Sequence, residues 1–567
     1  MQTIELHKVK QKQCIHPSEF VDNLSLGDLK GVNVLFINMP LRETAIPNTP
    51  PQGPGLMAAR LRQYGASPTI IDLNAYRIKD EHALAKNLPN GRHLTLSETE
   101  GLLRAHFHKH GEPHMVALSG MITTLRWQSE VATMVKKLIP DTFLVTGGGL
   151  ATEVKAGLFQ WIPQMDAIAH SEGDDIILLM ARDVKLKNTR GMEAACASPF
   201  YLGEIEGKQR FLYGGDRPTN LDILPYAAWD LLEEDALGNP VLEWYIKQPV
   251  WGLAANNSSA APFTMKRSLT TVSSRGCPYA CAFCYRGAQG ERNYGMRGVK
   301  NLADEVRWLV NKYNVDFVGF PDDNFAVRVD RCQALPEAFE GLNIRWGTHT
   351  RLDESDMQRL IPMSKSGCIY IGFGAESAAE KTLQRMKKGG FILRKGLVKI
   401  NGFELPRTMV EGVTNCREVG IHSNCTWIMG YPGETLEDLK TSVGFILWQE
   451  QLYTQGLTPG SEEYKIALNS VNKKMFTATA YPGTAMYKDP YVKDQLTEHF
   501  DIQFGDDGEP VCNEGLKKYI EELDDATKVL TDKNGEPLNF SAMSMEQFLE
   551  ARHYIDSGRI EKILDMK

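Results

Sequence analysis

The sequence predicts an α/β protein with two domains, a doubly wound parallel sheet and then a partial barrel of six βα units, followed by a helical tail. Its 567 residues exceed what one hydrophobic core usually serves. Apolar runs of buried-strand length alternate with helix-like stretches in two series, which is typical of parallel sheets covered by helices. We therefore divide the chain into an N-terminal extension (1–30), a doubly wound domain (31–185), a connecting segment (186–268), the partial barrel (269–487) and a C-terminal helical region (488–567).

Five runs mark the strands of the first domain. They are VNVLFINM (32–39), PTIIDL (68–73), MVALSG (115–120), FLVTGGG (143–149) and DAIAHSEGDD (166–175). One helix follows the first run and ends at Gly65, and another lies between the third and fourth runs. This alternation predicts a Rossmann-like sheet that binds its ligand at the carboxyl ends of the strands.

Six further runs mark the strands of the second domain. They are LTTVSSRG (269–276), VDFVGFPDD (315–323), IRWGTHTR (344–351), CIYIGFGAES (368–377), SNCTWIMGYPG (423–433) and KMFTATAYPGT (474–484). Six βα units are too few for an eight-stranded barrel but suffice for a partial, open one. We interpret 389–412 as an insertion after the fourth of these strands that lines the substrate mouth together with the tail.

The composition excludes several classes of protein. The formal net charge of −8 argues against a nucleic-acid partner, which normally leaves a basic footprint. The polar start MQTIELHKVKQKQ lacks the apolar region of a signal peptide, and no stretch approaches the roughly 20 apolar residues of a membrane span. We expect a cytoplasmic protein with reduced thiols. Seven scattered cysteines are then small buried residues: Cys14, Cys196, Cys332, Cys368, Cys416, Cys425 and Cys512.

The stretch SRGCPYACAFCYRG places Cys277, Cys281 and Cys284 within eight residues. A structural zinc site or a ferredoxin-type cluster takes a fourth protein ligand, yet neither Cys nor His follows before Cys332. A four-iron cluster held by three thiolates leaves one iron free for a small-molecule chelate, and this is the more economical interpretation. A structural metal site is the alternative. Phe283 is placed to shield the cluster from water.

The CxxxCxxC spacing, with an aromatic residue before the third cysteine, resembles the radical S-adenosylmethionine (SAM) superfamily. The resemblance implies a [4Fe–4S] cluster whose open iron binds the amino and carboxylate groups of SAM. The reduced cluster then cleaves SAM to a 5′-deoxyadenosyl radical. It also implies a partial (βα)6 barrel, which the six runs match, and an external electron donor of the flavodoxin or ferredoxin type.

Six residues at the strand ends match SAM-contacting positions of that family: Asp322, Asp323, Arg351, Glu376, Ser377 and Gly430. The resemblance implies that the two aspartates accept the amino group of SAM, although an aspartate pair is otherwise a turn or N-cap feature. It implies that Arg351 pairs with the carboxylate through its planar fork. Glu376 and Ser377 would accept the ribose hydroxyls, and the turn at Gly430 would let the backbone approach the adenine.

A doubly wound domain ahead of such a barrel resembles the cobalamin-binding subgroup of the superfamily. Its marks are hydroxyl residues after the third strand and glycines after the fourth, namely Ser119, Thr123, Gly147, Gly148 and Gly149, with SEGDD (171–175) where the subgroup shows GEGE. The resemblance implies that the glycines let the backbone approach the nucleotide tail of cobalamin and that the hydroxyls bind it. The alternative is a degenerate Rossmann-like domain that binds nothing.

The loop after the first strand departs from the subgroup's pattern. Many cobalamin domains carry Asp-x-His-x-x-Gly there, but LRETAIPNTPPQGPG contains no histidine. The subgroup often lacks this ligand, so we expect Arg42 or Glu43 to face the cobalt or to hold a water there. The similar stretch Asp80–Ala83 lacks the glycine and is interpreted as part of a solvated helix.

These resemblances together imply methyl transfer to an unactivated carbon of a small-molecule or peptide substrate. The 5′-deoxyadenosyl radical would form a substrate radical, methylcobalamin would supply the methyl group, and a second SAM would remethylate the cobalamin. The main alternative is a cobalamin-dependent cyclisation or rearrangement without net methylation. A methylthiotransferase is a remote alternative, because it needs a second three-cysteine cluster near the N-terminus, where this chain has only Cys14 and Cys196.

Overall fold

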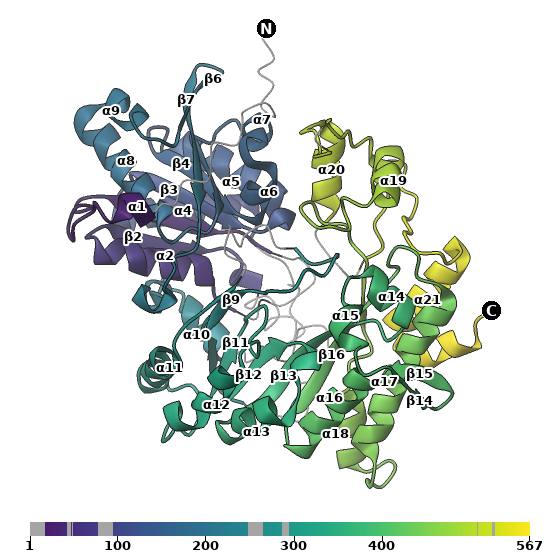
Figure 1. Ribbon diagram of the computed structural model, residues 1–567. Coiled ribbons are helices and arrows are strands. Elements are labelled where there is room, and N and C mark those ends of the chain that lie inside the picture. Colours follow the sequence, from purple (N-terminus) through teal and green to yellow (C-terminus); the bar gives the residue numbers. More distant parts are fainter. Residues whose placement is uncertain are drawn as a thin grey trace. The chain divides into compact units, whose positions relative to one another are not determined.

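The computed structural model describes residues 18–41, 47, 49–77, 94–247, 265–285, 294–506, 508–523 and 528–567 (Figure 1). The chain splits into two compact units. The first unit comprises residues 1–245, 286–295 and 500–524, and the second comprises 246–285, 296–499 and 525–567.

The first unit contains a seven-stranded sheet with the strand order β2-β1-β3-β4-β5-β7-β6. The first five strands are parallel and confirm the five predicted runs: β1 (Asn33–Asn38), β2 (Ser67–Asp72), β3 (Met115–Gly120), β4 (Phe143–Gly148) and β5 (Ala167–Ser171). The strand order reverses between β1 and β3. This sheet therefore has a topological switch point at the ends of those two strands, where doubly wound folds bind ligands.

Two further strands come from the stretch that the sequence left as a connecting segment. They are β7 (Lys208–Gly215), parallel to β5, and β6 (Tyr201–Ile205), antiparallel to β7. Arg210 lies buried in the middle of β7 and donates hydrogen bonds to the carbonyl oxygens of Met165 and Pro163. A buried arginine interrupts the apolar pattern of the strand, which is why the pattern did not predict it.

Helices cover the sheet of the first unit. They are α2 (Gln52–Gln63), α4 (Leu96–His110), α5 (Leu125–Leu138), α6 (Gly149–Val154), α7 (Leu158–Trp161), α8 (Ile176–Arg190) and α9 (Met192–Cys196). Helix α2 packs on α8, and α4 packs on α5. The crossovers through α2 and α5 run in opposite directions along the sheet, so right-handed connections place these two helices on opposite faces.

A segment of the predicted helical tail belongs to the first unit. Helix α20 (Glu514–Glu522) packs on α5 and on the short helix η2 (Ile122–Thr124), which follows β3. The guanidinium of Arg126 lies 3.8 Å from the Glu521 carboxylate. The chain thus returns to the edge of the sheet where Thr123 lies.

The second unit contains a six-stranded parallel sheet with the order β17-β16-β13-β12-β11-β8. Its strands are β8 (Ser268–Thr270), β11 (Phe317–Phe320), β12 (Arg345–Thr350), β13 (Cys368–Glu376), β16 (His422–Met429) and β17 (Met475–Thr477). They confirm the six predicted runs. Each strand neighbours the next one in sequence order, so right-handed crossovers place all the connecting helices on one face and leave the other face open.

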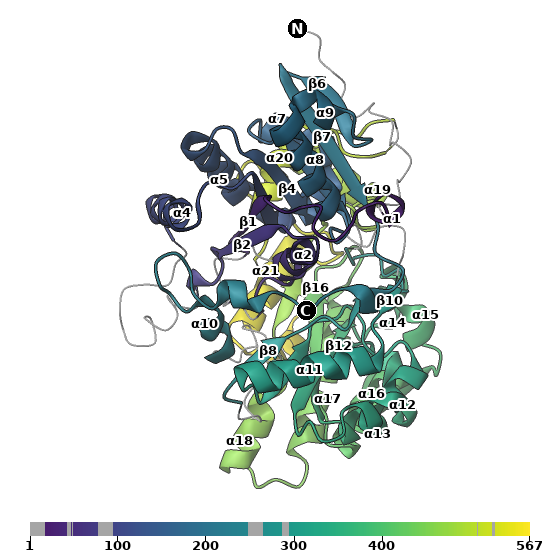
Figure 2. The ribbon, with the colours of Figure 1, turned by 90° about the vertical axis from the view of Figure 1, so that its left-hand side faces the viewer.

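The helices of this unit fall between and after the strands. They are α11 (Val299–Tyr313), α12 (Val329–Ala338), α13 (Met357–Lys365), α14 (Glu380–Arg385), α15 (Gly389–Ile392), α16 (Arg407–Glu418), α17 (Leu436–Thr454), α18 (Glu462–Asn469), α19 (Pro490–Phe500) and α21 (Met545–Asp556). Figure 2 shows α11, α12, α13 and α16 along the same side of the sheet. Within the ranges that the structure describes, no helix is long and apolar enough to span a bilayer.

Aromatic side chains fill the core between the sheet and these helices. Trp346 of β12 is fully buried, and its ring centroid lies 5.4 Å from that of Phe320 and 5.2 Å from that of Phe325. Trp427 of β16 packs in the same way on Phe445 of α17, at 5.4 Å. Because side chains alternate along a strand, the odd-numbered residues of β12 face the open side of the sheet.

The insertion 389–412 is ordered rather than structureless. It contains α15, a hairpin of β14 (Leu397–Ile400) and β15 (Phe403–Pro406), and the start of α16. Asn401 and Gly402 form the two-residue turn of this hairpin, and both have positive φ angles, 51° and 90°. Asn-Gly is the preferred pair for such a turn, so the sequence carried a hairpin signal at this position.

Candidate active site at the cysteine loop

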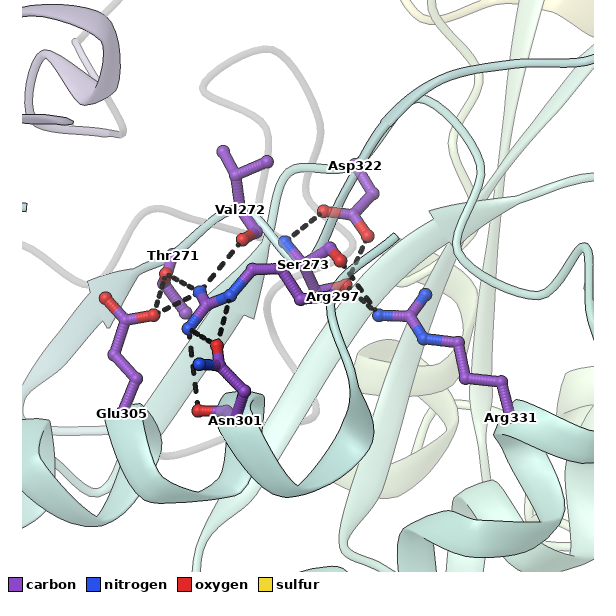
Figure 3. A network of polar contacts seen from close by, with 8 residues as sticks. All are labelled: Thr271, Val272, Ser273, Arg297, Asn301, Glu305, Asp322 and Arg331. Atoms are coloured by element: carbon purple, nitrogen blue, oxygen red, sulfur yellow. Dashed lines mark hydrogen bonds and ion pairs between the residues drawn. The ribbon is translucent and has the colours of Figure 1, made fainter. Parts of the chain in front are cut away.

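The cysteine loop is anchored where it leaves the sheet. The backbone N–H of Ser273 donates to the Asp322 carboxylate at 2.8 Å, and the hydroxyls of Ser273 and Ser274 donate to the other oxygen of that carboxylate. Asp322 is buried. These three bonds, of which Figure 3 shows those to Ser273, use both carboxylate oxygens. They favour a positioning role for Asp322 over the SAM contact that the resemblance implied.

Arg331 completes this anchor from α12. Its guanidinium donates to the Ser273 carbonyl at 3.1 Å and to the Ser273 hydroxyl at 2.7 Å, and it stacks 4.4 Å from the ring of Phe325. Asp322 and Arg331 thus both bind Ser273 (Figure 3). The charges of Asp322 and Arg331 are both buried beside Ser273. Because they have opposite signs, they compensate the free-energy cost of removing each charge from water.

A second buried pair fixes the preceding residues. Arg297 forms an ion pair with Glu305 of α11 and donates to the Val272 carbonyl at 3.2 Å, while the Thr271 hydroxyl donates to Glu305 at 2.8 Å (Figure 3). Asn301 accepts a bond from Arg297 at 2.8 Å. The strand that leads to the cysteines is therefore held on both sides by charged hydrogen bonds.

Two buried donors point at the cysteine sulfurs. The Asn324 amide nitrogen lies 3.9 Å from Cys277 Sγ, and its orientation is fixed by the Thr350 hydroxyl, which donates to the amide oxygen at 2.7 Å. Arg351 Nη1 lies 3.4 Å from Cys281 Sγ. Burial raises the pKa of the Cys277 thiol, and the Asn324 amide and the Arg351 guanidinium oppose this shift.

Arg351 is locked in place by its other neighbours. Its Nε donates to Asp353 at 2.9 Å, and its guanidinium lies 4.0 Å from the ring centroid of Tyr279. The Tyr279 hydroxyl donates to Glu354 at 2.7 Å. Burial is the main reason why the pKa of this phenol is raised, and the Glu354 carboxylate raises the pKa further. The residue that the resemblance assigned to the SAM carboxylate thus lies at the cluster loop itself.

Asp323 has a different environment from Asp322. It is exposed, and one of its carboxylate oxygens accepts the backbone N–H of Gly276 at 3.0 Å. Gly276 directly precedes Cys277. The structure therefore leaves a carboxylate open to solvent at the start of the cysteine loop.

Glu376 and Lys388 form a buried pair near the same loop. Lys388 Nζ lies 3.6 Å from Glu376 Oε1 and 5.9 Å from the ring centroid of Phe283. Burial raises the pKa of Glu376, and Lys388 opposes this shift. Glu376 also has a positive φ of 67°, an uncommon conformation for this residue type that is often found at functional sites. Sequence reasoning missed Lys388, which stands in a run of other basic residues.

Ser377 and Gly430 have structural partners. The buried Ser377 hydroxyl accepts the backbone N–H of Ala379 at 3.2 Å and lies 3.3 Å from the Ser442 hydroxyl. Gly430 has a φ of 80°, and its N–H donates to Glu434 at 2.6 Å. A side chain at 430 would come within 2.7 Å of Phe548 from α21, so only glycine fits this turn.

Two glycines of β13 leave room for neighbouring side chains on the open face of the sheet. A side chain at Gly372 would come within 2.4 Å of the His349 ring, and one at Gly374 would come within 2.3 Å of the Glu376 carboxylate. His349 is exposed on the face opposite Trp346, two residues before Arg351. Sequence reasoning did not single out His349, although its place in THTR was a signal.

The first unit brings its predicted residues to the carboxyl edge of the sheet. The Ser119 carbonyl accepts the N–H of Met39 at 2.9 Å, and the Thr123 hydroxyl donates to the Leu41 carbonyl at 3.4 Å. These bonds join the ends of β1 and β3 at the switch point. Arg42, Glu43 and Asp80–Ala83 lie outside the described residues.

The glycines after β4 lie beside this point. Gly148 has a φ of 94°, and a side chain there would come within 2.2 Å of the Gly120 carbonyl oxygen. Gly147 has ordinary contacts of 3.7 Å or more at the same position, and Gly149 begins α6. The backbone at the ends of β3 and β4 therefore carries no side chains at Gly120, Gly147 and Gly148. This suits the close approach of a large ligand.

A buried polar network lies behind these glycines and was not predicted. Gln128 of α5 is fully buried, and its amide donates to the Thr124 hydroxyl at 2.9 Å. The Thr146 hydroxyl donates to the amide oxygen of Gln128. The network fixes η2 against β4.

The donor set fits an open iron–sulfur cluster. Among the described residues, no three His, Cys, Asp or Glu side chains are close enough together to hold a single metal ion, the loop cysteines included. A four-iron cluster binds each thiolate to a different iron, so its cysteines need not converge on one point. Three thiols from one anchored loop, with Asn324 and Arg351 beside two of them, meet that requirement.

Comparison with protein families supports the same interpretation. Residues 271–446 match the model of the radical SAM superfamily, a range that includes the cysteine loop and the strand ends of β11, β12, β13 and β16. Residues 271–446 therefore form a radical SAM domain. The chain shares sequence with curated radical SAM and methyltransferase proteins along much of its length.

Three of these relatives are informative. An uncharacterized methyltransferase of Pyrococcus horikoshii is 22% identical over 421 residues, which are 73% of this chain and 76% of the relative. Cytidylyl-2-hydroxyethylphosphonate methyltransferase of Streptomyces wedmorensis is 26% identical over 431 residues, or 70% of this chain and 73% of the relative. The anaerobic magnesium-protoporphyrin IX monomethyl ester cyclase of Cereibacter sphaeroides is 22% identical over 352 residues, and the match covers 60% of this chain but only 50% of the cyclase.

Solved structures show the same fold. The cobalamin-dependent radical SAM enzyme OxsB superposes with a TM-score of 0.58 at 16% identity, and the match covers 86% of this chain and 64% of OxsB. The radical SAM methyltransferase TsrM of Kitasatospora setae superposes with a TM-score of 0.57 at 14% identity and covers 94% of this chain and 89% of TsrM. The match extends over both units of this chain.

Proposed function

We propose that this protein is a cobalamin-dependent radical SAM methyltransferase that methylates an unactivated carbon of a small-molecule or peptide substrate. The observation that carries the proposal is the cysteine loop, which presents three thiols at the carboxyl edge of an open parallel sheet with Arg351 3.4 Å from Cys281 Sγ. The doubly wound first unit, with its bare backbone at the switch point, supports cobalamin as a second cofactor.

Cys277, Cys281 and Cys284 would hold the [4Fe–4S] cluster. With SAM and cobalamin bound, these cofactors supply one-electron cleavage of SAM and a transferable methyl group. The chain anchors the loop through Asp322 and Arg331 and stabilises the thiolates through Asn324 and Arg351. Its own part is to position the cofactors and to exclude water.

Asp323 and Glu376 are the proposed contacts of SAM. The Asp323 carboxylate is exposed beside Gly276, and a carboxylate at this place can accept hydrogen bonds from an ammonium group. Glu376 lies near the cluster loop at the end of β13, and Lys388 balances its charge. We propose that the second Nη of Arg351 pairs with the SAM carboxylate, which is the role that the resemblance implies for this residue.

We assign cobalamin to the edge of the first unit formed by Ser119, Thr123 and Gly147–Gly149. The two hydroxyl residues lie at the switch point, and the glycines end the neighbouring strand. Gly148 has no room for a side chain, and a side chain at Gly147 would meet ordinary contacts of 3.7 Å or more. The loop that contains Arg42 remains the proposed cobalt-facing segment.

The substrate is proposed to occupy the open face above Gly372 and Gly374. His349 is exposed there. A neutral imidazole can accept a proton from the substrate or orient a polar group on it. We propose this role for His349.

Methylation and cyclisation give different products from the same cofactors. The curated relatives include both methyltransferases and cyclases, and the methyltransferases of Pyrococcus and Streptomyces cover more of this chain than the cyclase does. The test is anaerobic purification, reconstitution and product analysis with SAM. Formation of both 5′-deoxyadenosine and S-adenosylhomocysteine supports methylation, whereas 5′-deoxyadenosine alone supports a cyclase-type reaction.

A protein of this kind needs a reductant and an oxygen-poor, reducing compartment. We propose the cytoplasm as its location, in keeping with its reduced cysteines. The donor of the electron is proposed to be a flavodoxin or ferredoxin.

A further inference from the structure

The residues after β13 form a strongly basic surface on an acidic chain. The stretch 381–399 contains seven Lys and Arg and no Asp or Glu, although the whole chain has a formal net charge of −8. Six of the seven are exposed: Lys381, Arg385, Lys387, Arg394, Lys395 and Lys399. They lie on α14, α15, β14 and the turns between them (Figure 1).

This surface is in direct contact with the cysteine loop. The backbone N–H of Ala282, between the second and third cysteines, donates to the Met386 carbonyl at 2.8 Å. Lys387 is the next residue and is exposed. The positive charges therefore begin one residue from a hydrogen bond to the loop that carries the cluster ligands.

An exposed aromatic residue connects the surface to a cluster cysteine. Phe391 is half exposed, and its ring centroid lies 5.3 Å from that of Tyr279. Tyr279 stacks under Arg351 at 4.0 Å, and Arg351 Nη1 lies 3.4 Å from Cys281 Sγ. Three successive side-chain contacts thus lead from solvent to the cluster ligand.

Much of the charge is not neutralised by the protein itself. Lys395 pairs with Glu411, and Arg385 lies 3.8 Å from Asp438. In the part of the chain that the structure describes, no carboxylate forms an ion pair with Lys381, Lys387 or Arg394. Arg394 donates only to the Asp353 carbonyl, at 3.4 Å. A surface of this kind attracts an acidic partner.

We propose that an acidic one-electron carrier protein, which reduces the cluster, docks on a surface formed by Phe391 and three exposed basic residues. These three residues are Lys387, Arg394 and Lys395, and we call them the basic rim. The carrier gives one electron to the cluster and is itself oxidised by one electron. Phe391 supplies the apolar centre of the contact and the basic residues supply its rim. This inference rests on the proposed function, because it assumes that the three cysteines hold a reducible cluster.

The test measures cluster reduction by reduced flavodoxin in stopped-flow absorbance, using the full-length reconstituted protein. The double variant K387E/R394E should raise the flavodoxin concentration needed for half-maximal rate by about tenfold and flatten the dependence on ionic strength. Phe391→Ala should slow reduction by flavodoxin as well. With dithionite as the reductant, all variants should be reduced and should cleave SAM as the wild type does.

The matched control is K312E/K365E. Both lysines are exposed and precede strands β11 and β13, so they lie at the amino edge of the same sheet. This control makes the same change in net charge and should leave reduction by flavodoxin unaltered.

Three results would overturn the docking surface. One is unchanged flavodoxin kinetics in K387E/R394E, and another is an equal loss in the control variant. The third is an equal loss of SAM cleavage with dithionite, which would assign the basic rim to an anionic substrate or to SAM instead. A wild-type cluster that is reduced by flavodoxin but cleaves no SAM would contradict the proposed function and leave the docking kinetics measurable.

Discussion

Arg351 Nη1 lies 3.4 Å from Cys281 Sγ while its Nε is bound to Asp353. The guanidinium therefore connects the third strand of the open sheet to the cysteine loop and brings its charge to a cluster ligand. A planar group with several fixed donors can make both contacts and still offer a donor to a carboxylate.

Replacing Arg351 should separate cluster binding from SAM binding. R351K keeps the charge but loses the fork, and we expect SAM cleavage to fall by about two orders of magnitude, equivalent to about 2.7 kcal/mol. Iron content should remain near that of the wild type, since three cysteines are intact. The measurement is 5′-deoxyadenosine formation with dithionite, beside iron and sulfide analysis. Wild-type cleavage in R351K would show that Arg351 does not contact SAM.

The neighbouring aspartates should give opposite phenotypes. D322N replaces one of the two acceptor oxygens by an amide donor and removes the negative charge that lies with Arg331 at Ser273. We expect a loss of stability of about 3 kcal/mol and poor cluster incorporation. D323N changes an exposed carboxylate, so it should keep wild-type stability and iron content but weaken SAM binding. Thermal unfolding and equilibrium binding of SAM to the reconstituted protein check both, and identical behaviour of the two variants would contradict the assignment.

Glu434 should make the stability of the second unit depend on pH. Burial raises the pKa of Glu434 to about 8, and its Oε1 has no hydrogen-bond partner among the described residues. The folded form binds the proton more tightly than the unfolded form, so this contribution to stability is present below about pH 4.5 and is lost as the pH rises through about 8. Thermal unfolding between these values should show the decline in the wild type and a weaker one in E434Q.

The control for Glu434 is E437Q, at an exposed position three residues later. It should follow the wild-type profile. A wild-type profile in E434Q would mean that another group causes the pH dependence.

The glycines after β4 should separate folding from cobalamin binding. G148A places a methyl group within 2.2 Å of the Gly120 carbonyl at a φ of 94°, so it should destabilise the first unit by more than about 1 kcal/mol. G147A meets only ordinary contacts at 3.7 Å and should keep the fold. If cobalamin lies against this strand end, G147A should still lower the cobalamin content measured by absorbance. Full cobalamin content in a well-folded G147A would argue against this location.

His349 should affect the substrate step more than SAM cleavage. In H349N the imidazole is lost from the open face while Arg351 and the cysteine loop are intact. We expect 5′-deoxyadenosine to form at a rate within a few fold of wild type and methylated product to fall by about 10²-fold, the size of a general acid–base contribution. Product analysis of the same reaction measures the ratio. A parallel loss of both products would place His349 in SAM binding.

Much of the fold followed from the sequence because parallel strands that are buried on both faces form continuous apolar runs. The runs around VNVLFINM and VDFVGF are of this kind, and both became strands with a neighbour on each side. Strand β7 did not follow, because Arg210 is buried within it and satisfied by carbonyls that only the tertiary structure supplies. The hairpin at Asn401–Gly402 was predictable in principle from its turn residues.

The site was predictable to the level of the loop and the strand ends. Asp322 and Asp323 could not be told apart in the sequence, because only the tertiary structure buries Asp322 and leaves Asp323 exposed at Gly276. Lys388 and His349 were missed for a related reason. Their importance depends on Gly374 and Gly372 of the neighbouring strand, which leave the space that these side chains enter.

The most direct test of the account compares the wild type with the C277A/C281A/C284A variant after anaerobic reconstitution with iron, sulfide and cobalamin. The account predicts that the wild type holds a four-iron cluster and cobalamin, and that it forms both 5′-deoxyadenosine and S-adenosylhomocysteine from SAM once a substrate is supplied. The variant should retain cobalamin but cleave no SAM. SAM cleavage in the cysteine variant, or a wild type that binds neither cluster nor cobalamin, would contradict the account.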